Sequence, residues 1–349
     1  MIYAGLDLHK NFSVITTMNA QGKEMVKQKK LPNNGEIIEL FQGFNEPVTL
    51  AMEATRSWYW LYDLLEENGI EVKLSHPLKT KAIASAKVKN DKIDSRILAH
   101  LLRTELLPLS YVPPKPVRMH RELLRYRASL VKIQTGVKNR VHAILAKNNI
   151  THNFSDLFGK QGKAFLTSLS LSETYRMAVD GYLSVLDELE QQIKAVNKRI
   201  VVSVKDDEDT GLLMTIPGVG YYSALLIKSE IGDINRFPSA KQLCSYAGLT
   251  PSTYSSGNTT FHGHITKQGS KWLRWIAAEA IGHCVAKPGH LQAFYRRLQR
   301  RKGEKIAKVA TERKLLEWIY HMLKERKTFQ KIEKMVSYQG EPVSVTGLK

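Results

Sequence analysis

The sequence has very few cysteines, and this scarcity limits the kinds of site that it can form. Its 349 residues contain only Cys244 and Cys284, which argues against a disulfide framework and a cysteine-based zinc site. No apolar run approaches the roughly 18 residues of a membrane-spanning helix. The first residues lack the basic segment and apolar core of a signal peptide, so nothing marks the chain for export. We therefore expect a protein of the reducing cell interior that does not act in a membrane.

Acidic residues are scarce relative to basic ones. The chain has 33 Asp and Glu against 52 Lys and Arg, which leaves a formal net charge of +19 and a pI near 9.7. A surplus of this size is typical of a protein that binds a polyanion, most often nucleic acid. The length allows roughly two domains of about 150 residues each.

The first hundred residues predict an α/β domain. Strand-like runs at 2–8, 12–18 and 25–31 are joined by short turns, which favours an antiparallel meander. The pattern then continues with a helix at 37–41, a strand at 48–52, a helix at about 57–67 and a strand at 71–74. A meander followed by alternating helices and strands is the order of the ribonuclease H-like fold, which we predict for this domain.

Four carboxylates occupy unusual positions in this domain. Asp7 lies within the first strand-like run, Glu53 ends the run 48–52, and Asp91 and Asp94 begin a helical segment. Asp is depleted from strands because its short side chain competes for backbone hydrogen bonds. In a ribonuclease H-like sheet the first strand is central, so Asp7 and Glu53 can meet. A spacing of three puts Asp91 and Asp94 on one face of a helix.

Converging carboxylates need bound cations or shared protons, because two of them about 4 Å apart repel by roughly 4 kcal/mol at an effective dielectric of 20. Mg²⁺ prefers hard oxygen ligands, so the four side chains predict a magnesium site that orients or activates a phosphodiester. Structural alternatives exist at each position. Asp7 could cap a turn, Glu53 could begin a loop, and Asp91 and Asp94 could stabilise a helix amino terminus.

The middle of the chain predicts a long basic helix. Four prolines make residues 107–116 an extended connection, and a helical pattern follows from 118 to 147. Its polar faces are almost entirely basic, which predicts contact with a phosphate backbone, and a solvated charged face is the alternative. The residues that we single out are Arg118, Arg121, Arg125 and Lys132.

A second long helix carries an apolar stripe. Apolar residues between 175 and 200 recur in 4-3 spacing, which is typical of a coiled coil. We favour self-association through this stripe into a homo-oligomer, a dimer or a tetramer. An antiparallel hairpin with the preceding helix of the same chain would show the same stripe.

The carboxyl-terminal region contains three further candidates. Gly218 and Gly220 belong to a Pro-Gly-x-Gly turn that is similar to a helix-hairpin-helix, whose backbone N–H groups approach a phosphate; a plain interhelical turn is the alternative. The stretch 252–258 is a Ser/Gly turn by composition, although one of its hydroxyls could attack a phosphodiester. Arg300 and Arg301 belong to an arginine run that predicts another nucleic-acid contact or a solvated helix end.

Together these motifs resemble the DEDD-type insertion-sequence transposases, a group of bacterial recombinases that includes the pilin-gene invertase. The order of the motifs matches from residue 1 to about 285. The matching motifs are Gly-Leu-Asp7, Met-Glu53-Ala-Thr, Asn-Asp91-Lys-Ile-Asp94-Ser-Arg, Ile-Pro-Gly-Val-Gly, and Ala-Gly-Leu-Thr-Pro followed by Ser256-Gly257.

The resemblance implies a resolvase-like ribonuclease H domain whose catalytic metal ligands are Asp7, Glu53, Asp91 and Asp94, with Mg²⁺ as the cofactor. It also implies a carboxyl-terminal transposase domain whose nucleophile is Ser256, and a covalent serine–DNA intermediate in the exchange of donor and target DNA. A bridge RNA would guide this exchange, and the carboxylate domain of one subunit would meet the serine domain of another. Such a protein would work in the bacterial cytoplasm at the nucleoid.

One assignment stays open within this resemblance. Ser255 adjoins Ser256, and either hydroxyl could be argued from chemistry, so the choice of Ser256 depends on the Ser-Gly pair of the family.

These expectations divide the chain into three parts. They are a ribonuclease H-like catalytic domain with a basic helix at 1–150, a coiled coil at 151–206, and a mainly helical transposase domain with a basic tail at 207–349. Two rival functions are a metal-dependent, structure-selective DNA nuclease with water as its nucleophile and a non-catalytic nucleic-acid scaffold. The nuclease would form no covalent adduct, and the scaffold would leave the carboxylates unexplained.

Overall fold

The computed structural model describes residues 1–55, 57–83, 91–256 and 259–338, without the side chains at 91–93, 262 and 336–338. It forms two compact units, residues 1–113 and 114–349. No helix in these described ranges combines the length and hydrophobicity that crossing a membrane requires.

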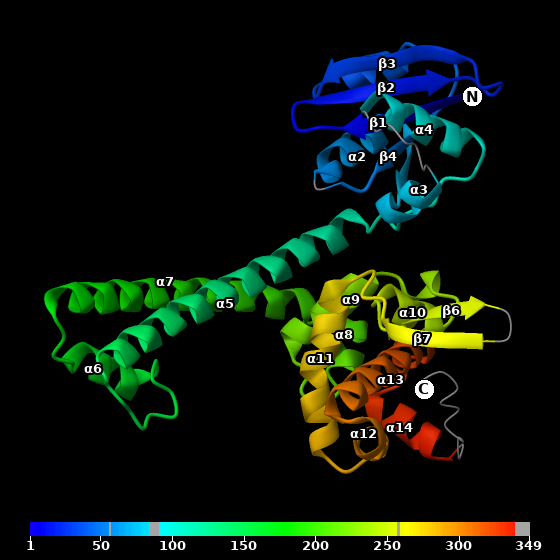
Figure 1. Cartoon of the computed structure of the whole chain (residues 1–349). Helices are drawn as coiled ribbons and strands as arrows, with labels where there is room; N and C mark the ends of the chain where they lie inside the picture. Colours follow the sequence, from blue (N-terminus) through cyan, green and yellow to red (C-terminus); the bar gives the residue numbers. More distant parts are fainter. Residues whose placement is uncertain (56, 84–90, 257–258, 339–349) are drawn as a thin grey trace. The chain divides into compact units, whose positions relative to one another are not determined.

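The first unit is built on a mixed five-stranded sheet (Figure 1). Its strands are β1 (Ile2–Leu8), β2 (Phe12–Met18), β3 (Glu24–Pro32), β4 (Val48–Glu53) and β5 (Glu71–Ser75), in the spatial order β3-β2-β1-β4-β5. The first three strands pair antiparallel, whereas β4 pairs parallel with both β1 and β5. The predicted meander, the predicted later strands and the central place of β1 are confirmed.

Helices cover both faces of this sheet. They are α1 (Glu36–Gln42), α2 (Trp58–Glu67), α3 (Pro77–Ile83) and α4 (Asp91–Arg103). α1 and α2 pack on one face through Ile37, Phe41 and Leu61, whereas α4 packs on the other through Leu98 and Leu102. Because both faces are covered, β1 and β4 are apolar along most of their length. This burial explains why a carboxylate in either strand is conspicuous in the sequence.

The second unit begins with two long antiparallel helices, which lie side by side in Figure 1. They are α5 (Lys115–Lys147) and α7 (Glu173–Val204), connected through α6 (Lys160–Ser168). α5 begins at Lys115, three residues before the predicted start, because Pro116 is accepted in the first helical turn.

The apolar stripe of α7 packs against α5 of the same chain. The buried residues of the stripe include Val179, Leu186, Leu189, Val196 and Ile200. Leu186, Leu189, Val196 and Ile200 share a core with Leu124, Leu130 and Val137 of α5, and Arg127 donates to the Asn197 side chain at 2.6 Å. The intrachain hairpin is therefore the alternative that the structure contains, and the stripe by itself does not require a second chain.

The rest of the second unit is helical except for one hairpin. Its elements are α8 (Glu208–Leu213), α9 (Tyr221–Ile231), the 3-10 helix η1 (Ile234–Arg236), α10 (Ala240–Tyr246), β6 (Pro251–Ser256), β7 (Thr259–Ile265), α11 (Lys271–Ala286), α12 (His290–Lys302), α13 (Glu304–Glu325) and α14 (Phe329–Tyr338). Side chains of α9, α11 and α13 dominate its core.

The β6–β7 hairpin corrects the interpretation of 252–258 as only a turn. Residues 251–256 pair with 259–265, and the tip at 257–258 lies outside the described residues. Composition suggested a turn because Ser and Gly are common in turns, but Thr253, Tyr254 and Phe261 favour a pleated strand. The three-part division at 150 and 206 stays a prediction.

Candidate functional site

Asp7 and Glu53 lie at adjoining carboxyl ends of the two central parallel strands. The last parallel pair of β1 and β4 is Leu6 with Met52, and the two acidic residues each come directly after it. Adjacent strands are about 4.8 Å apart, so the two backbones are neighbours at this point. The predicted meeting of the strand ends that carry these carboxylates is therefore found in the sheet.

Both carboxylates belong to the face of the sheet that α4 covers. Side chains alternate along a strand, so Asp7 shares a face with Gly5, and Glu53 shares a face with Ala51. Ala51 packs with leucines of α4. At Gly5 the helix comes so close that an added Cβ would overlap the Ser95 carbonyl oxygen and lie 2.6 Å from the Ala99 nitrogen.

The amino terminus of α4 lies at the same end of the sheet. Arg103, the last residue of α4, donates to the Ala20 carbonyl at 3.3 Å in the turn after β2. That turn lies beside the amino end of β1, because Tyr3 pairs with Met18. α4 therefore runs antiparallel to β1, and its first residues reach the carboxyl end where Asp7 and Glu53 lie.

Asp91 and Asp94 are at this end of α4. Asp94 is partly buried, whereas Asp91 begins the helix and its side chain lies outside the described residues. In the part of the chain that the structure describes, no group of three or more His, Cys, Asp or Glu side chains is gathered as a metal site. The fold thus brings the backbone positions together, and ligation by the four carboxylates stays a prediction.

His9 is a neighbour of Asp7 that the sequence reasoning did not select. Its Nε2 lies 3.0 Å from an Asp7 carboxylate oxygen, and its ring stacks on Phe12 at a centroid distance of 4.6 Å. The contact holds the Asp7 side chain, which is 17% exposed, in one orientation. The sequence did contain a signal for this contact. Asp7 and His9 are two residues apart, and in extended backbone residues at this spacing point to the same side.

Ser255 and Ser256 lie at the end of β6, on opposite faces of the hairpin. The Ser255 hydroxyl lies 3.1 Å from that of Thr260, which pairs directly with it. Ser256 pairs with Thr259, and its side chain is exposed. A phosphodiester on one face of the hairpin can therefore reach only one of these two hydroxyls directly.

Packing explains one of the two glycines in the turn between α8 and α9. Gly218 has a φ of +80°, and an added Cβ would overlap the ring of His283 in α11. Gly220 is extended, precedes α9 as its N-cap, and has open space where a Cβ would be. The close approach of α11 accounts for Gly218, whereas packing does not account for Gly220.

The four predicted basic contacts of α5 differ in exposure. Arg118 and Arg121 are buried, and Arg121 donates to the carbonyls of Ser229 and Glu230 at 2.8 and 3.0 Å. Arg125 is partly buried and donates to the Glu230 carboxylate at 2.9 Å. Phosphate contact by these arginines stays a prediction, but the hydrogen bonds of Arg121 and Arg125 connect α5 to the end of α9.

The other predicted contacts lie on the surface. Lys132 on α5 is exposed, as are Arg300 and Arg301 near the end of α12. These three side chains are free of the packing constraint that applies to Arg118 and Arg121.

Comparison with known proteins finds two transposase family models that match this chain. A family model described as "Transposase", of the DEDD type, matches residues 4–150, and a model described as "Transposase IS116/IS110/IS902 family" matches residues 210–296. The chain belongs to this family of insertion-sequence transposases. The first match spans all four carboxylates of this transposase, and the second spans Ser256 and the glycine turn.

Named relatives of this transposase match most of its length. The transposase for insertion sequence element IS1111A of Coxiella burnetii is 27% identical over 290 residues, covering 80% of this chain and 79% of the relative. A probable family 20 transposase of Pseudomonas aeruginosa is 26% identical, covering 87% and 91%. The transposase for element IS1328 of Yersinia enterocolitica is 25% identical, covering 79% and 81%. This chain is accordingly an enzyme that cleaves and joins DNA.

Proposed function

We propose that this transposase moves its element through a covalent serine–DNA intermediate, with a ribonuclease H-like domain that binds Mg²⁺. The observation that supports the proposal most is that four acidic residues belong to one end of the sheet, where β1 and β4 end and α4 begins. Asp7 and Glu53 adjoin on one face of the sheet, and the helix that covers this face begins with Asp91 and Asp94. Carboxylates that gather in one place repel one another unless a bound cation or a shared proton offsets their charge.

The strand order and strand directions support the ribonuclease H-like assignment. β1, β2 and β3 form the antiparallel part, β4 and β5 continue the sheet in parallel, and β1 is central. These features match the order that the sequence predicted for this fold.

The donor chemistry of the carboxylates fits Mg²⁺. Asp7, Glu53, Asp91 and Asp94 would supply only hard oxygen ligands, which is the set that this ion prefers. When bound, the ion would polarise a phosphate and offset its negative charge. His9 orients Asp7 through the 3.0 Å contact and would hold this carboxylate ready for the ion.

Ser256 is the proposed nucleophile. Its Oγ attacks the phosphorus of one DNA strand, an Oγ–P bond forms, and one P–O bond to deoxyribose breaks. The hydroxyl proton leaves to a base and the released sugar oxygen takes up a proton. Attack by the hydroxyl of the new strand end reverses the step and restores Ser256, so no bond energy is lost.

The partners that we propose are donor and target DNA, a bridge RNA as a guide, and further copies of the chain. The net charge of +19 and the exposed Lys132, Arg300 and Arg301 support contact with nucleic acid. The carboxylates and the serine belong to different compact units. They would act on one phosphodiester within a dimer or tetramer, at the bacterial nucleoid.

A covalent adduct assay tests this proposal. Purified protein is incubated with labelled element-end DNA and Mg²⁺, stopped in detergent, and examined for DNA that migrates with protein under denaturing conditions. We expect the wild-type adduct to map to a peptide containing Ser256. S256A should abolish the adduct and retain DNA binding, whereas S255A, the matched control on the opposite face, should retain both.

The same assay tests the carboxylates. We expect D7N and D94N to lower adduct formation by roughly 100-fold or more, because a positioned charge on the reacting phosphate is lost. DNA binding should remain. Strand cleavage by S256A without an adduct would instead show a nuclease that uses water, and DNA binding without cleavage by the wild type would show a scaffold.

A further inference from the structure

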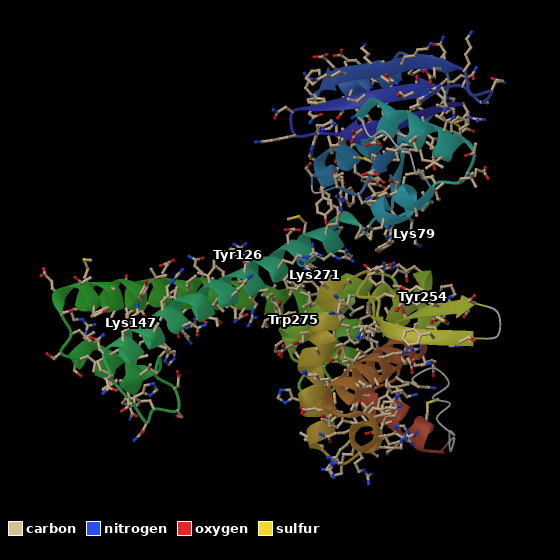
Figure 2. The ribbon with its side chains drawn as sticks, in the orientation of Figure 1. Lys79, Tyr126, Lys147, Tyr254, Lys271 and Trp275 are labelled. Carbon is tan, nitrogen blue, oxygen red and sulfur yellow. The ribbon has the colours of Figure 1, made fainter. Side chains whose placement is uncertain are left out.

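The β6–β7 hairpin carries two large aromatic side chains that are exposed to solvent. Tyr254 is 69% exposed and Phe261 is 62% exposed. They are directly paired across the two strands, and Tyr254 is labelled on β6 in Figure 2. Directly opposite side chains have Cβ atoms about 5 Å apart, so the two rings form one apolar surface. Exposed aromatic area of this kind is costly in water unless a partner covers it.

This aromatic pair shares a face with Ser256. The pairs Tyr254 with Phe261 and Ser256 with Thr259 are separated by one intervening pair, Ser255 with Thr260. Because side chains alternate, the first two pairs point to one side of the hairpin and the intervening pair points to the other. The 3.1 Å contact between the Ser255 and Thr260 hydroxyls agrees with this alternation. The rings thus lie one strand repeat, about 7 Å, from the proposed nucleophile.

Charge around the hairpin favours a polyanion over an acidic or apolar protein surface. Residues 234–278 contain no Asp or Glu but include Arg236, Lys241, Lys267, Lys271 and Arg274. Lys267 and Lys271 are exposed and follow β7 closely in the chain. An aromatic surface within a stretch that has only positive charge is the combination by which proteins hold unpaired nucleobases, whose phosphates meet the cations while the bases stack on rings.

We propose that Tyr254 and Phe261 form a stacking surface for an unpaired nucleobase next to the phosphodiester that Ser256 attacks. This inference deepens the proposed function and depends on it for the role of Ser256. The base leaves its own stack and lies on the rings, which brings the adjoining phosphate toward the serine. Stacking tolerates any base, so the surface positions the strand without choosing its sequence.

Binding of short oligonucleotides tests the surface without any need for cleavage. The probes are a single-stranded DNA and a single-stranded RNA of the same sequence, each with 2-aminopurine at one position, and the corresponding DNA duplex. We expect the full-length wild-type protein to change the 2-aminopurine fluorescence of a single strand more than that of the duplex. Loss of both rings in Y254A/F261A should weaken single-strand binding by roughly 5- to 150-fold.

Three variants separate stacking from other roles. T260V, on the opposite face of the same hairpin, should bind like the wild type, and Y254F/F261Y should retain binding because both residues stay aromatic. S256A should bind like the wild type. If S256A still forms an adduct but the rings remain necessary for binding, the nucleophile assignment fails and the stacking surface stands.

The opposite result overturns the inference. Unchanged single-strand binding by Y254A/F261A, with a melting curve like that of the wild type, would exclude a stacking role. A change in oligomeric mass of this variant by light scattering, with nucleic-acid binding unchanged, would assign the rings to contact between copies of the chain. Tighter binding of the DNA probe than of the RNA probe would support the inference, because the strand that Ser256 attacks is DNA. Binding of the RNA probe alone would overturn it.

Discussion

A buried carboxyl on α13 illustrates how a single residue makes stability depend on pH. Glu312 is only 5% exposed. Burial raises the pKa of its side chain from the ordinary value of 4.5 to about 7, against the opposing charges of Lys308 and Arg274. Arg274 also donates to the Ala247 carbonyl at 2.7 Å, just before the residues that lead into β6.

We predict that Glu312 makes the folded protein less stable as the pH rises from about 4.5 to about 7. In this window the folded chain keeps the Glu312 proton and the unfolded chain loses it, so each increase in pH favours unfolding, by about 3 kcal/mol in total. E312Q should lose this part of the pH dependence and exceed the wild type in stability at pH 8, in chemical denaturation at several pH values. E122Q, at a carboxylate that is 59% exposed, should keep the wild-type curve.

At the scale of elements, the contact between α4 and β1 decides whether the carboxylate positions come together. Gly5 allows the helix backbone to lie directly on the strand, and the hydroxyls of Thr16 and Ser95 are 2.9 Å apart in the same layer. The glycine of the Gly-Leu-Asp motif is therefore explained by packing. The role of Asp7, two residues later, as a metal ligand stays a prediction.

We predict that G5A destabilises the first unit by about 3 kcal/mol, because the new methyl group must displace α4 at Ser95 and Ala99. The measurement is denaturant unfolding of the full chain together with the adduct assay, which should fail in parallel. G136A is the matched control, since a Cβ at this exposed position in α5 meets nothing within 4 Å. It should raise stability by up to about 1 kcal/mol. Equal stability of G5A and the wild type would contradict the close contact.

At the scale of the whole molecule, the positive charge is divided between surface and interior. The formal net charge is +19, but Arg118 and Arg121 are buried, and Arg121 bonds to the end of α9. In the sequence pattern of α5, Arg118 and Arg121 cannot be distinguished from Lys132. In the structure, of these three side chains only that of Lys132 is exposed and can contact a phosphate. The effective surface for nucleic acid is therefore smaller than the charge alone implies.

We predict that Lys132, Arg300 and Arg301 contribute to the salt dependence of DNA binding. Each phosphate contact that is removed makes the slope of log K against log salt concentration shallower by about one. The slope of the triple alanine variant should therefore be shallower than that of the wild type by about three. The measurement is a DNA-binding titration at several salt concentrations. R121A should instead lower the melting temperature, because buried carbonyls lose their donor. An unchanged slope in the triple variant would assign these side chains to a solvated surface.

Local patterns in the sequence were sufficient to predict most of the strands and helices of the first unit. Strands 2–8, 12–18 and 48–53 are apolar with β-branched residues, and their predicted bounds agree with the structure within a residue or two. The neighbouring positions of Asp7 and Glu53 could be predicted from the strand order, because a central first strand and its parallel neighbour end side by side. Ligation of a metal did not follow, since it depends on side-chain positions that strand order leaves free.

The amino-acid sequence was enough to show which residues of a strand or helix share a face and where carboxylates interrupt apolar strands. It also showed how far basic residues outnumber acidic ones. Which faces meet became known only from the folded chain. It placed α5 on the stripe of α7, buried Arg118 and Arg121, and put Tyr254 and Phe261 on the same side of a hairpin as Ser256. The physical reason is that periodicity is a local property of the backbone, whereas a choice between packing partners depends on contacts between residues far apart in the chain.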